Sequence, residues 1–167
     1  MPPNMGFKKT SDMIAISFSA ASTVVDTYAE EEISLQLDVL NNEIFVVLAI
    51  DLNPSTPQAV GGTNTNTAAA VSSTSQPTIG KLSNSNVLAV AELNIRDGLV
   101  PFSRLAQESY VGDLDYIGLI ATNNFFVGID SANTGSTHTV RGRVFGYRAK
   151  ADASTYAALV QSEVLSS

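Results

Sequence analysis

Apolar and polar residues alternate most strictly in the run Ile33-Ser34-Leu35-Gln36-Leu37-Asp38-Val39, where every second side chain is apolar. A period of two is typical of a β-strand with one face in the core and one face in water. The next run, Ile44-Phe45-Val46-Val47-Leu48-Ala49-Ile50, is apolar throughout and indicates a strand covered on both faces. Asn41-Asn42 lies between the two runs, and asparagine tolerates the positive φ of a tight turn. We therefore expect a hairpin over residues 32–52 at the centre of the fold.

Strand patterns recur on both sides of this hairpin, and no β-α-β rhythm accompanies them. Asn123-Asn124 separates two of these segments and predicts a second hairpin. The other expected strands cover residues 13–19, 86–95, 115–121, 125–129 and 138–150. The sequence therefore predicts an all-β chain, an antiparallel β-sandwich of the jelly-roll type.

The period changes from two to about three and a half at the end of the chain. Asp152 or Ser154 is suited to cap the first turn of a helix. The apolar residues that follow are spaced as on one face of a short amphipathic helix, namely Tyr156, Leu159, Val160 and Val164. We expect a short C-terminal helix or tail over residues 152–167.

A length of 167 residues suits one domain. We expect an N-terminal arm over residues 1–11 and the sandwich over residues 12–151. The segment 53–86 is rich in Gly, Thr, Asn, Ala and Ser and has no periodicity, which favours a long exposed loop inserted between two strands.

Composition narrows the classes of function. The net charge is −7, which disfavours general nucleic-acid binding, because such binding depends on Lys and Arg. The chain has no Cys and one His, so disulfides are excluded and a zinc site is disfavoured. Residues 1–9 lack the apolar core of a secretory signal, and no apolar run is long enough to span a membrane. We expect synthesis and folding in the cytosol.

The strand expected over residues 138–150 holds four of the nine basic residues. Alternation places Arg141, Arg143, Phe145 and Tyr147 on one face. One interpretation is a protein interface, since Arg and Tyr are enriched where binding energy is concentrated. The alternatives are a nucleic-acid strip, or a solvated face on which the arginines pair with nearby acids.

Acidic residues are the other candidates for a site. Glu30-Glu31-Glu32 with Asp26, and the pair Asp113 and Asp115, could bind a hard cation, but neither has the spacing of a calcium loop. For Glu30-Glu31-Glu32 with Asp26, the favoured interpretation is that these acids are solvated or pair with the arginines of a neighbouring subunit. His138 would have to be the base of any Ser-His-Asp arrangement, and no nucleophile-elbow motif accompanies it. We expect no enzyme activity, no metal and no cofactor.

The layout of the chain resembles the single jelly-roll coat proteins of icosahedral viruses. The resemblance rests on a short arm with Phe7-Lys8-Lys9, two sets of strands with a small-residue insertion between them, and a helical tail. It implies two facing sheets, a virion location, partners that are copies of the chain or other virion proteins, and termini that link neighbouring subunits. Under that interpretation, the candidate interface residues are Phe7, Lys8, Lys9, Arg141, Arg143, Phe145, Tyr147, Tyr156, Leu159 and Val160. The arm has only two basic residues, which disfavours direct genome contact and leaves contact with an internal membrane open.

Two other functions are compatible with the same sequence. A carbohydrate-binding sandwich would use Tyr28, Tyr110 and Tyr116 as stacking platforms. A subunit of an extracellular filament would polymerise through an inserted strand.

Overall fold

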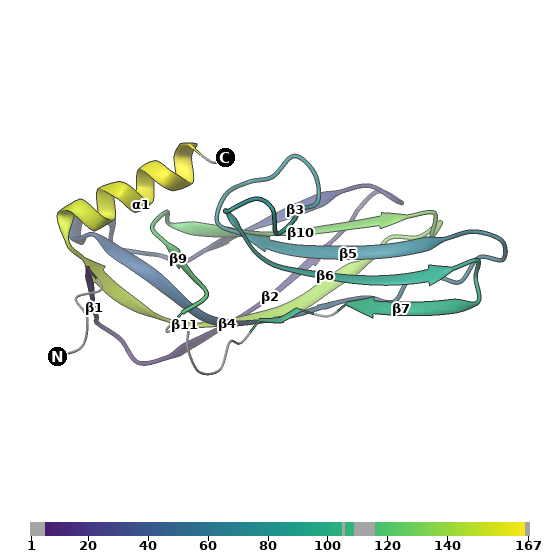
Figure 1. Ribbon diagram of the computed structural model, residues 1–167, viewed down its shortest axis with the longest axis horizontal. Coiled ribbons are helices and arrows are strands. Elements are labelled where there is room, and N and C mark those ends of the chain that lie inside the picture. Colours follow the sequence, from purple (N-terminus) through teal and green to yellow (C-terminus); the bar gives the residue numbers. More distant parts are fainter. Residues whose placement is uncertain (1–5, 105, 109–115, 166–167) are drawn as a thin grey trace.

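A computed structural model describes residues 6–104, 106–108 and 116–165, and folds them into two antiparallel β-sheets packed face to face (Figure 1). Sheet A is built around β11, which pairs with β1 and β2 on one side and with β4 on the other, and β4 in turn pairs with β8 and β9. Its strands are β1 (Phe7–Lys9), β2 (Ile14–Ala21), β4 (Glu43–Pro54), β8 (Ala106–Glu108), β9 (Gly118–Ile120) and β11 (Thr139–Ala151).

Sheet B has the strand order β3-β10-β5-β6-β7. Its strands are β3 (Ala29–Ser34), β5 (Thr65–Ser72), β6 (Val87–Arg96), β7 (Val100–Arg104) and β10 (Asn124–Ala132). Taken together, the pairs in the two sheets are nested, since β2 pairs with β11, β3 with β10, β4 with β9 and β5 with β6. This nesting is the jelly-roll arrangement, and the predicted all-β sandwich with one short helix is confirmed.

The main core lies between the two sheets and is closed around two phenylalanine rings, Phe18 and Phe125, which meet edge to face at 5.9 Å. A β-bulge in β4 shapes this core. Phe145 pairs with Ala49 and Gly146 with Val47, so Leu48 has no partner on β11. The extra residue shifts the alternation of β4 by one position. As a result Phe45, Val47, Ile50 and Leu52 all face the core. The stretch is apolar throughout because its other face also packs, with Ile44, Val46 and Leu48 in a second apolar cluster.

A second apolar cluster lies on the opposite, outer face of sheet A, where the helix α1 (Ala153–Leu165) covers one end of the sheet (Figure 1). The Asp152 carboxylate caps the helix by accepting a hydrogen bond from the Thr155 amide at 2.8 Å. The predicted short C-terminal helix is therefore confirmed, and of the two candidate caps, Asp152 and Ser154, Asp152 bonds the first turn. No helix among the described residues is long and apolar enough to cross a membrane.

Both predicted hairpins are wrong. The strand before Asn41-Asn42 ends at Ser34 in sheet B, whereas β4 belongs to sheet A. Leu35 and Leu37 are nevertheless buried, because the chain crosses from one sheet to the other along the end of the core. In the same way β9 belongs to sheet A and β10 to sheet B, so residues 121–123 connect two sheets. Alternation detects a buried face but does not identify the strand's partner.

The loop expected over residues 53–86 is wrong for its middle part, because β5 lies in the centre of sheet B with nearly every residue buried. Its small side chains face the core on one side and are covered on the other by the segment 73–86. Gly80 in that segment lies over β5, since a Cβ atom there would lie 3.4 Å from the Ala70 Cβ and 2.7 Å from the Val87 side chain. A strand covered on both faces shows no alternation, and alanine and asparagine are poor strand formers.

The expected N-terminal arm also contains a strand. β1 pairs with the end of β11, so that Phe7 lies opposite Ala151 and Lys9 opposite Ala149. Phe7 packs into the second apolar cluster, and residues 1–5 of the expected arm lie outside the described residues.

Candidate interaction surface

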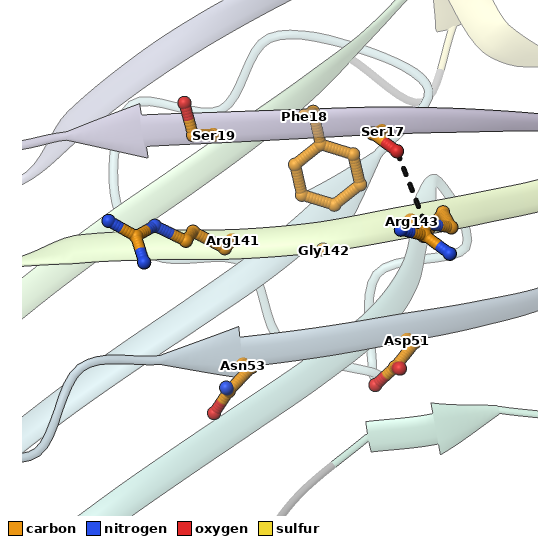
Figure 2. A pocket seen from close by; sticks show the side chains of 8 residues that line it. All are labelled: Ser17, Phe18, Ser19, Asp51, Asn53, Arg141, Gly142 and Arg143. Carbon is orange, nitrogen blue, oxygen red and sulfur yellow. Dashed lines mark hydrogen bonds between the residues drawn. The ribbon is translucent and has the colours of Figure 1, made fainter.

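The part of the outer face of sheet A that α1 and β1 do not cover is called the open half here. It carries two rows of polar side chains, and each row crosses the three neighbouring strands β2, β11 and β4. Strand register places Ser19, Arg141 and Asn53 in one row, and Ser17, Arg143 and Asp51 in the next. Figure 2 shows both rows, with the arginines on the middle strand and the serines and β4 residues on either side. They line a hollow of about 650 Å³. The alternation predicted for this strand therefore places Arg141 and Arg143 on one exposed face.

The two arginines differ in how they are held. The Arg143 Nε donates a hydrogen bond to the Ser17 hydroxyl at 3.1 Å, which fixes the guanidinium above the hollow (Figure 2). The Arg141 side chain has no hydrogen bond or ion pair with any residue that the structure describes. Only one ion pair joins side chains of the described residues, and it is formed by Arg148 and Glu43. Neither Arg141 nor Arg143 therefore forms an ion pair within the described chain, although the Asp51 carboxylate lines the same hollow.

Gly142 separates the two arginines because the sandwich leaves no room for a side chain there. A Cβ atom at this position would lie 2.4 Å from the Asp51 carbonyl oxygen and 2.6 Å from the Phe18 ring. Backbone cannot yield as a flexible side chain can, so glycine is required for β11 to pack closely against β4 and Phe18.

The other half of the outer face is covered by the chain's own termini. Tyr147 belongs to this half, and the Lys9 ammonium lies 5.1 Å from the centre of its ring. Phe7 meets Tyr116 edge to face at 5.8 Å. The remaining predicted interface residues on the helix pack into the same cluster and are half-buried there, namely Tyr156, Leu159 and Val160. Strand alternation thus places all the predicted residues of β1 and β11 except Lys8 on one face, but half of the predicted set already packs within the chain.

Phe145 and Lys8 complete the predicted set. Phe145 is half-buried on β11 between Arg143 and Tyr147. Lys8 is exposed and lies opposite Lys150 in the pairing of β1 with β11. By alternation, Lys8 and Lys150 lie on the face of sheet A opposite Arg141 and Arg143.

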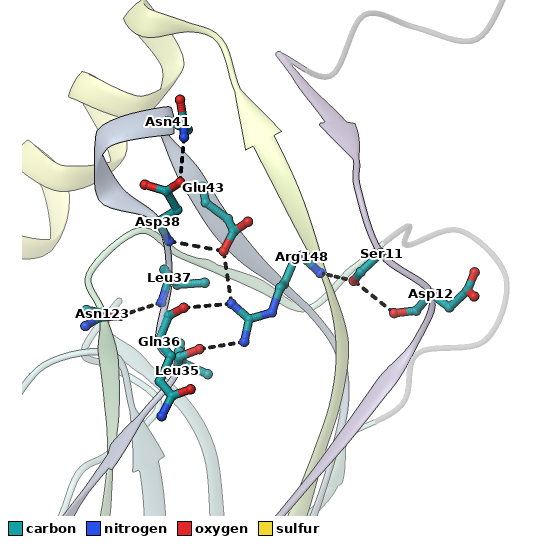
Figure 3. A network of polar contacts seen from close by, with 10 residues as sticks. All are labelled: Ser11, Asp12, Leu35, Gln36, Leu37, Asp38, Asn41, Glu43, Asn123 and Arg148. Atoms are coloured by element: carbon teal, nitrogen blue, oxygen red, sulfur yellow. Dashed lines mark hydrogen bonds and ion pairs between the residues drawn. The ribbon is translucent and has the colours of Figure 1, made fainter.

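Arg148 points the other way and binds the crossing segment between the two sheets (Figure 3). Its guanidinium donates to the carbonyl oxygens of Leu35 and Gln36 and to the Glu43 carboxylate, each at 2.9 Å. The predicted site omitted this residue. Its position could have been anticipated, since alternation places Arg148 on the face opposite Arg143, where a partly buried cation needs several partners.

His138 lies at the far end of the sandwich and joins three separate segments. Its Nδ1 lies 3.0 Å from the Ser55 hydroxyl and its Nε2 lies 3.0 Å from the Thr134 hydroxyl, which donates to Asp26 at 2.8 Å. Burial lowers the pKa of His138, although the Asp26 carboxylate acts in the opposite direction. Hydrogen bonds from the Thr134 backbone amide and hydroxyl and from the Gly135 amide lower the pKa of Asp26. Because the Thr134 hydroxyl donates to Asp26, it can accept a hydrogen bond from Nε2, which leaves Nδ1 to accept one from the Ser55 hydroxyl.

Ser55 and His138 also line a second hollow, of about 420 Å³, together with Arg141. The Ser55 hydroxyl accepts a further hydrogen bond from the Thr139 amide at 3.2 Å, and the Ser55 carbonyl accepts one from Thr67 at 2.7 Å. These bonds fix the start of the β4–β5 connection beside β11. The hydrogen-bonded group thus shapes one wall of the surface on which Arg141 stands.

Glu30 and Glu32, which were candidates for a cation site, accept hydrogen bonds from other residues. Glu30 accepts hydrogen bonds from the Ser75 hydroxyl at 2.5 Å and the Gln76 amide at 2.8 Å, and so holds the segment 73–86. Glu32 accepts one from the Asn124 side chain. No group of three potential metal ligands occurs among the described residues, and Asp113 and Asp115 lie outside them.

The tyrosines considered for carbohydrate stacking have other contacts. Tyr28 covers Gly128, where a Cβ atom would lie 2.7 Å from the Tyr28 hydroxyl, and it donates a hydrogen bond to Glu30 at 2.9 Å. Burial, with the neighbouring Glu30 carboxylate, raises the pKa of Tyr28. Tyr116 packs against Phe7, as described above, and Tyr110 lies outside the described residues.

Comparison with known proteins adds little to this description. No protein-family model and no curated protein matches the sequence. A chain from the structure of Desmodium yellow mottle tymovirus is similar to this chain at a TM-score of 0.31 and 13% sequence identity. The match covers 92% of this chain and 96% of the other. So low a score does not establish a shared fold, and the jelly-roll assignment rests on the strand order alone.

Proposed function

We propose that this chain is a self-assembling structural subunit that forms a virion shell through repeated contacts with copies of itself. The observation that carries the proposal is the open half of the outer face of sheet A. There Arg141 and Arg143 are exposed, and neither forms an ion pair with a carboxylate of the described chain. Charges left in this state on a rigid sheet are suited to meet the complementary charges of another surface.

The side chains around the two arginines favour a protein contact. Ser17, Ser19 and Asn53 are short or have few rotamers, so little conformational entropy is lost when a second surface covers them. Strand β11 is the central strand of sheet A, and its register with both neighbours fixes the rows of side chains. The surface is thus organised before any partner arrives.

The covered half of the same face would support the contact without forming it alone. Phe7, Tyr147, Tyr156, Leu159 and Val160 hold β1 and α1 on the sheet. In the proposed assembly their half-exposed surfaces, with Phe145 and Lys9, form the border of the contact. A specific contact of this kind buries about 800 Å² per partner, which is larger than the arginine hollow and requires this border.

The fold is compatible with the proposal but does not select it, since jelly rolls occur in viral capsids, lectins and cupins. A carbohydrate-binding module is the second candidate. Its specific support is that uncharged hydroxyl and amide groups surround Arg141 in both hollows.

The test is the size of the purified protein, measured by multi-angle light scattering, with negative-stain microscopy of any early-eluting fraction. Closed shells or regular rings support the proposal. A monomer of 17.6 kDa at every salt concentration and pH, over a protein concentration range up to about 1 mM, overturns it. In that case a glycan array tests the second candidate.

A further inference from the structure

Strand β2 forms an open edge of sheet A. It pairs with β11 on one side, in unbroken register from Ile14 to Ala21, and no strand of the described residues pairs with its other side. Figure 2 shows β2 as the outermost of the three strands that carry the polar rows. A strand edge of this kind presents backbone N–H and C=O groups that can pair with a strand of another molecule.

The hydrogen bonds of β11 show which backbone groups of β2 point outward. The Ser22 amide donates to the His138 carbonyl oxygen at 2.9 Å. The next carbonyl of β11, that of Thr139, accepts instead from Ser55 on the side of β4, also at 2.9 Å. Because bonding alternates along an antiparallel strand, the even-numbered residues of β2 bond to β11. The outward N–H and C=O groups, which no described residue bonds, are those of Ala15, Ser17, Ser19 and Ala21.

The other edge strands of the sandwich carry features that prevent pairing. β3 contains three consecutive glutamates, and β7 contains Pro101. β1, β8 and β9 have only 3 residues each. Charged side chains, proline and short length are the usual protection of a sheet edge. β2 has 8 residues, and it has no charged residue, no proline and no bulge. It is therefore the edge that remains available to a partner.

We infer that two copies of this chain pair through β2, antiparallel and across a two-fold axis at Phe18, so that sheet A continues from one copy into the other. This inference rests on the proposed function and names one surface through which copies meet. In this register Ser17 lies opposite Ser19 of the second copy, and Ala15 lies opposite Ala21 of the second copy. Each of these pairs joins outward-pointing residues and so exchanges two backbone hydrogen bonds.

The side chains of β2 are complementary to themselves in this register. On the outer face only serine and alanine meet, so the two strands can approach without a clash. On the inner face Ile16 lies opposite Ala20 of the second copy, a large side chain beside a small one. Phe18 stays in its own core, where it packs against Phe125. A second copy is therefore the occupant that the sequence of this edge fits.

Charge does not oppose the contact at the strands themselves. Each copy has a net charge of −7, but β2 has no charge, so no like charges meet between the paired strands. Arg143 of one copy and Arg141 of the other share a row, with two serines between them. At the usual spacing of strands, three steps separate these arginines by about 14 Å, which exceeds the screening length of about 8 Å at physiological salt.

The contact is isologous, so it occupies the β2 edge of both copies and ends at two chains. It does not build a shell alone. Ser17 and Ser19 border the arginine hollow, so pairing through β2 places the open halves of two copies side by side on one continuous sheet. The paired unit would then meet further copies through that enlarged surface.

Cysteine substitution tests the register directly, because the chain has no cysteine of its own. Ala15→Cys and Ala21→Cys are made as separate chains, both at exposed positions. Opposite Cα atoms in a hydrogen-bonded pair are about 5.5 Å apart, which suits a disulfide. An oxidised equimolar mixture should therefore form the mixed disulfide. Each variant alone should not cross-link, because its two cysteines would lie about 20 Å apart. Two-chain units without the mixed disulfide, or cross-linking of either variant alone, overturn the inference.

Proline substitution tests the backbone pairing. Ser19→Pro removes one outward N–H, and the two-fold axis removes it twice in each contact. Proline is tolerated where the N–H of an edge strand faces solvent, so the fold should persist, which circular dichroism checks. Dimerisation, measured by sedimentation, should weaken at least about tenfold. Ser19→Ala keeps the N–H and is the matched control, which should dimerise as the wild type does. Equal dimerisation of Ser19→Pro and Ser19→Ala overturns the inference.

Sedimentation is measured at about 1 M salt, which screens contacts of the exposed arginines and leaves backbone pairing intact. Shells of the wild type, with no mixed disulfide in the cysteine mixture, would overturn the inference and leave the proposed function standing. Two-chain units that cross-link as expected but never form a larger particle, at any salt concentration or pH, would support the inference and overturn the proposed function. A wild-type monomer under all conditions overturns both.

Discussion

The carboxylate of Glu163, near the end of α1, accepts a hydrogen bond from the backbone amide of Ala121 at 2.9 Å. Its second oxygen accepts one from the Thr122 amide at 3.1 Å. Glu163 is only 5% exposed, so the helix places a buried acid over the point where the chain leaves sheet A for sheet B. A buried backbone amide needs a partner, and here the C-terminal helix supplies it for two successive residues.

Glu163→Ala should lower the free energy of unfolding by about 2–3 kcal/mol, because it leaves these two amides without their charged acceptor. Urea denaturation followed by circular dichroism measures the change. Ser162→Ala, on the neighbouring exposed residue, is the matched control and should stay within about 0.5 kcal/mol of the wild type. A similarly small effect of Glu163→Ala would show that the helix is not held by this residue.

His138 should make stability depend on pH. Its pKa is lowered by burial in the folded protein, so the unfolded chain takes up a proton first as the pH falls below about 6.5. The free energy of unfolding should therefore be highest above that pH and decrease below it, by at most about 1.4 kcal/mol per pH unit for one proton. Urea midpoints between pH 8 and 5 measure the slope. In His138→Gln the slope over this range should disappear, and an unchanged slope would assign it to other groups.

Gly146 should not tolerate a side chain. A Cβ atom there would lie 2.2 Å from the Val46 carbonyl oxygen and 2.6 Å from the Phe45 ring, beside the bulge of β4. Gly146→Ala should therefore destabilise the protein by about 3 kcal/mol, at the upper end for overpacking, because backbone must move. Gly61→Ala is the control, since nothing lies within 4 Å of its Cβ position. Thermal unfolding separates the two, and equal melting temperatures would contradict the close approach of β11 to β4.

Glu30 should control the order of the segment 73–86. Glu30→Ala removes the acceptor of the Ser75 hydroxyl and the Gln76 amide, and hydrogen exchange at Gln76 should become at least about tenfold faster. Exchange in β5 should be unchanged, because its ladder does not depend on Glu30. Glu31→Ala, one residue along, is the control for loss of charge. Unchanged protection of Gln76 would mean that other contacts hold the segment.

The fold class could be predicted from the sequence because alternation and the change of period at Asp152 are local patterns. Which strands pair with each other could not be predicted from such patterns. Leu35 and Leu37 alternate with polar residues as in a strand, yet their amides are bound by Asn123 rather than by a strand ladder. Asn123 is far from Leu35 and Leu37 in the sequence, so no local pattern predicts these hydrogen bonds.

The candidate surface was predicted in part for a related reason. Alternation along one strand suffices to place Arg141 and Arg143 on the same face. It does not reveal that α1 and β1 cover the rest of that face, because this depends on which sheet the termini return to. The strand β5 was missed because burial on both sides removes the alternation by which strands are recognised, and small residues there resemble a loop in composition.

The central place of β11 also constrains how the protein can be made. It is the last strand in the sequence, yet it separates β2 from β4 and pairs with β1 as well. While the ribosome is still producing the middle of the chain, β2 and β4 have no strand to join them and their apolar faces are exposed. Completion of sheet A must therefore follow the synthesis of β11, and such long-range pairing is slow. Nascent chains should consequently depend on chaperones or on low concentration until β11 has emerged.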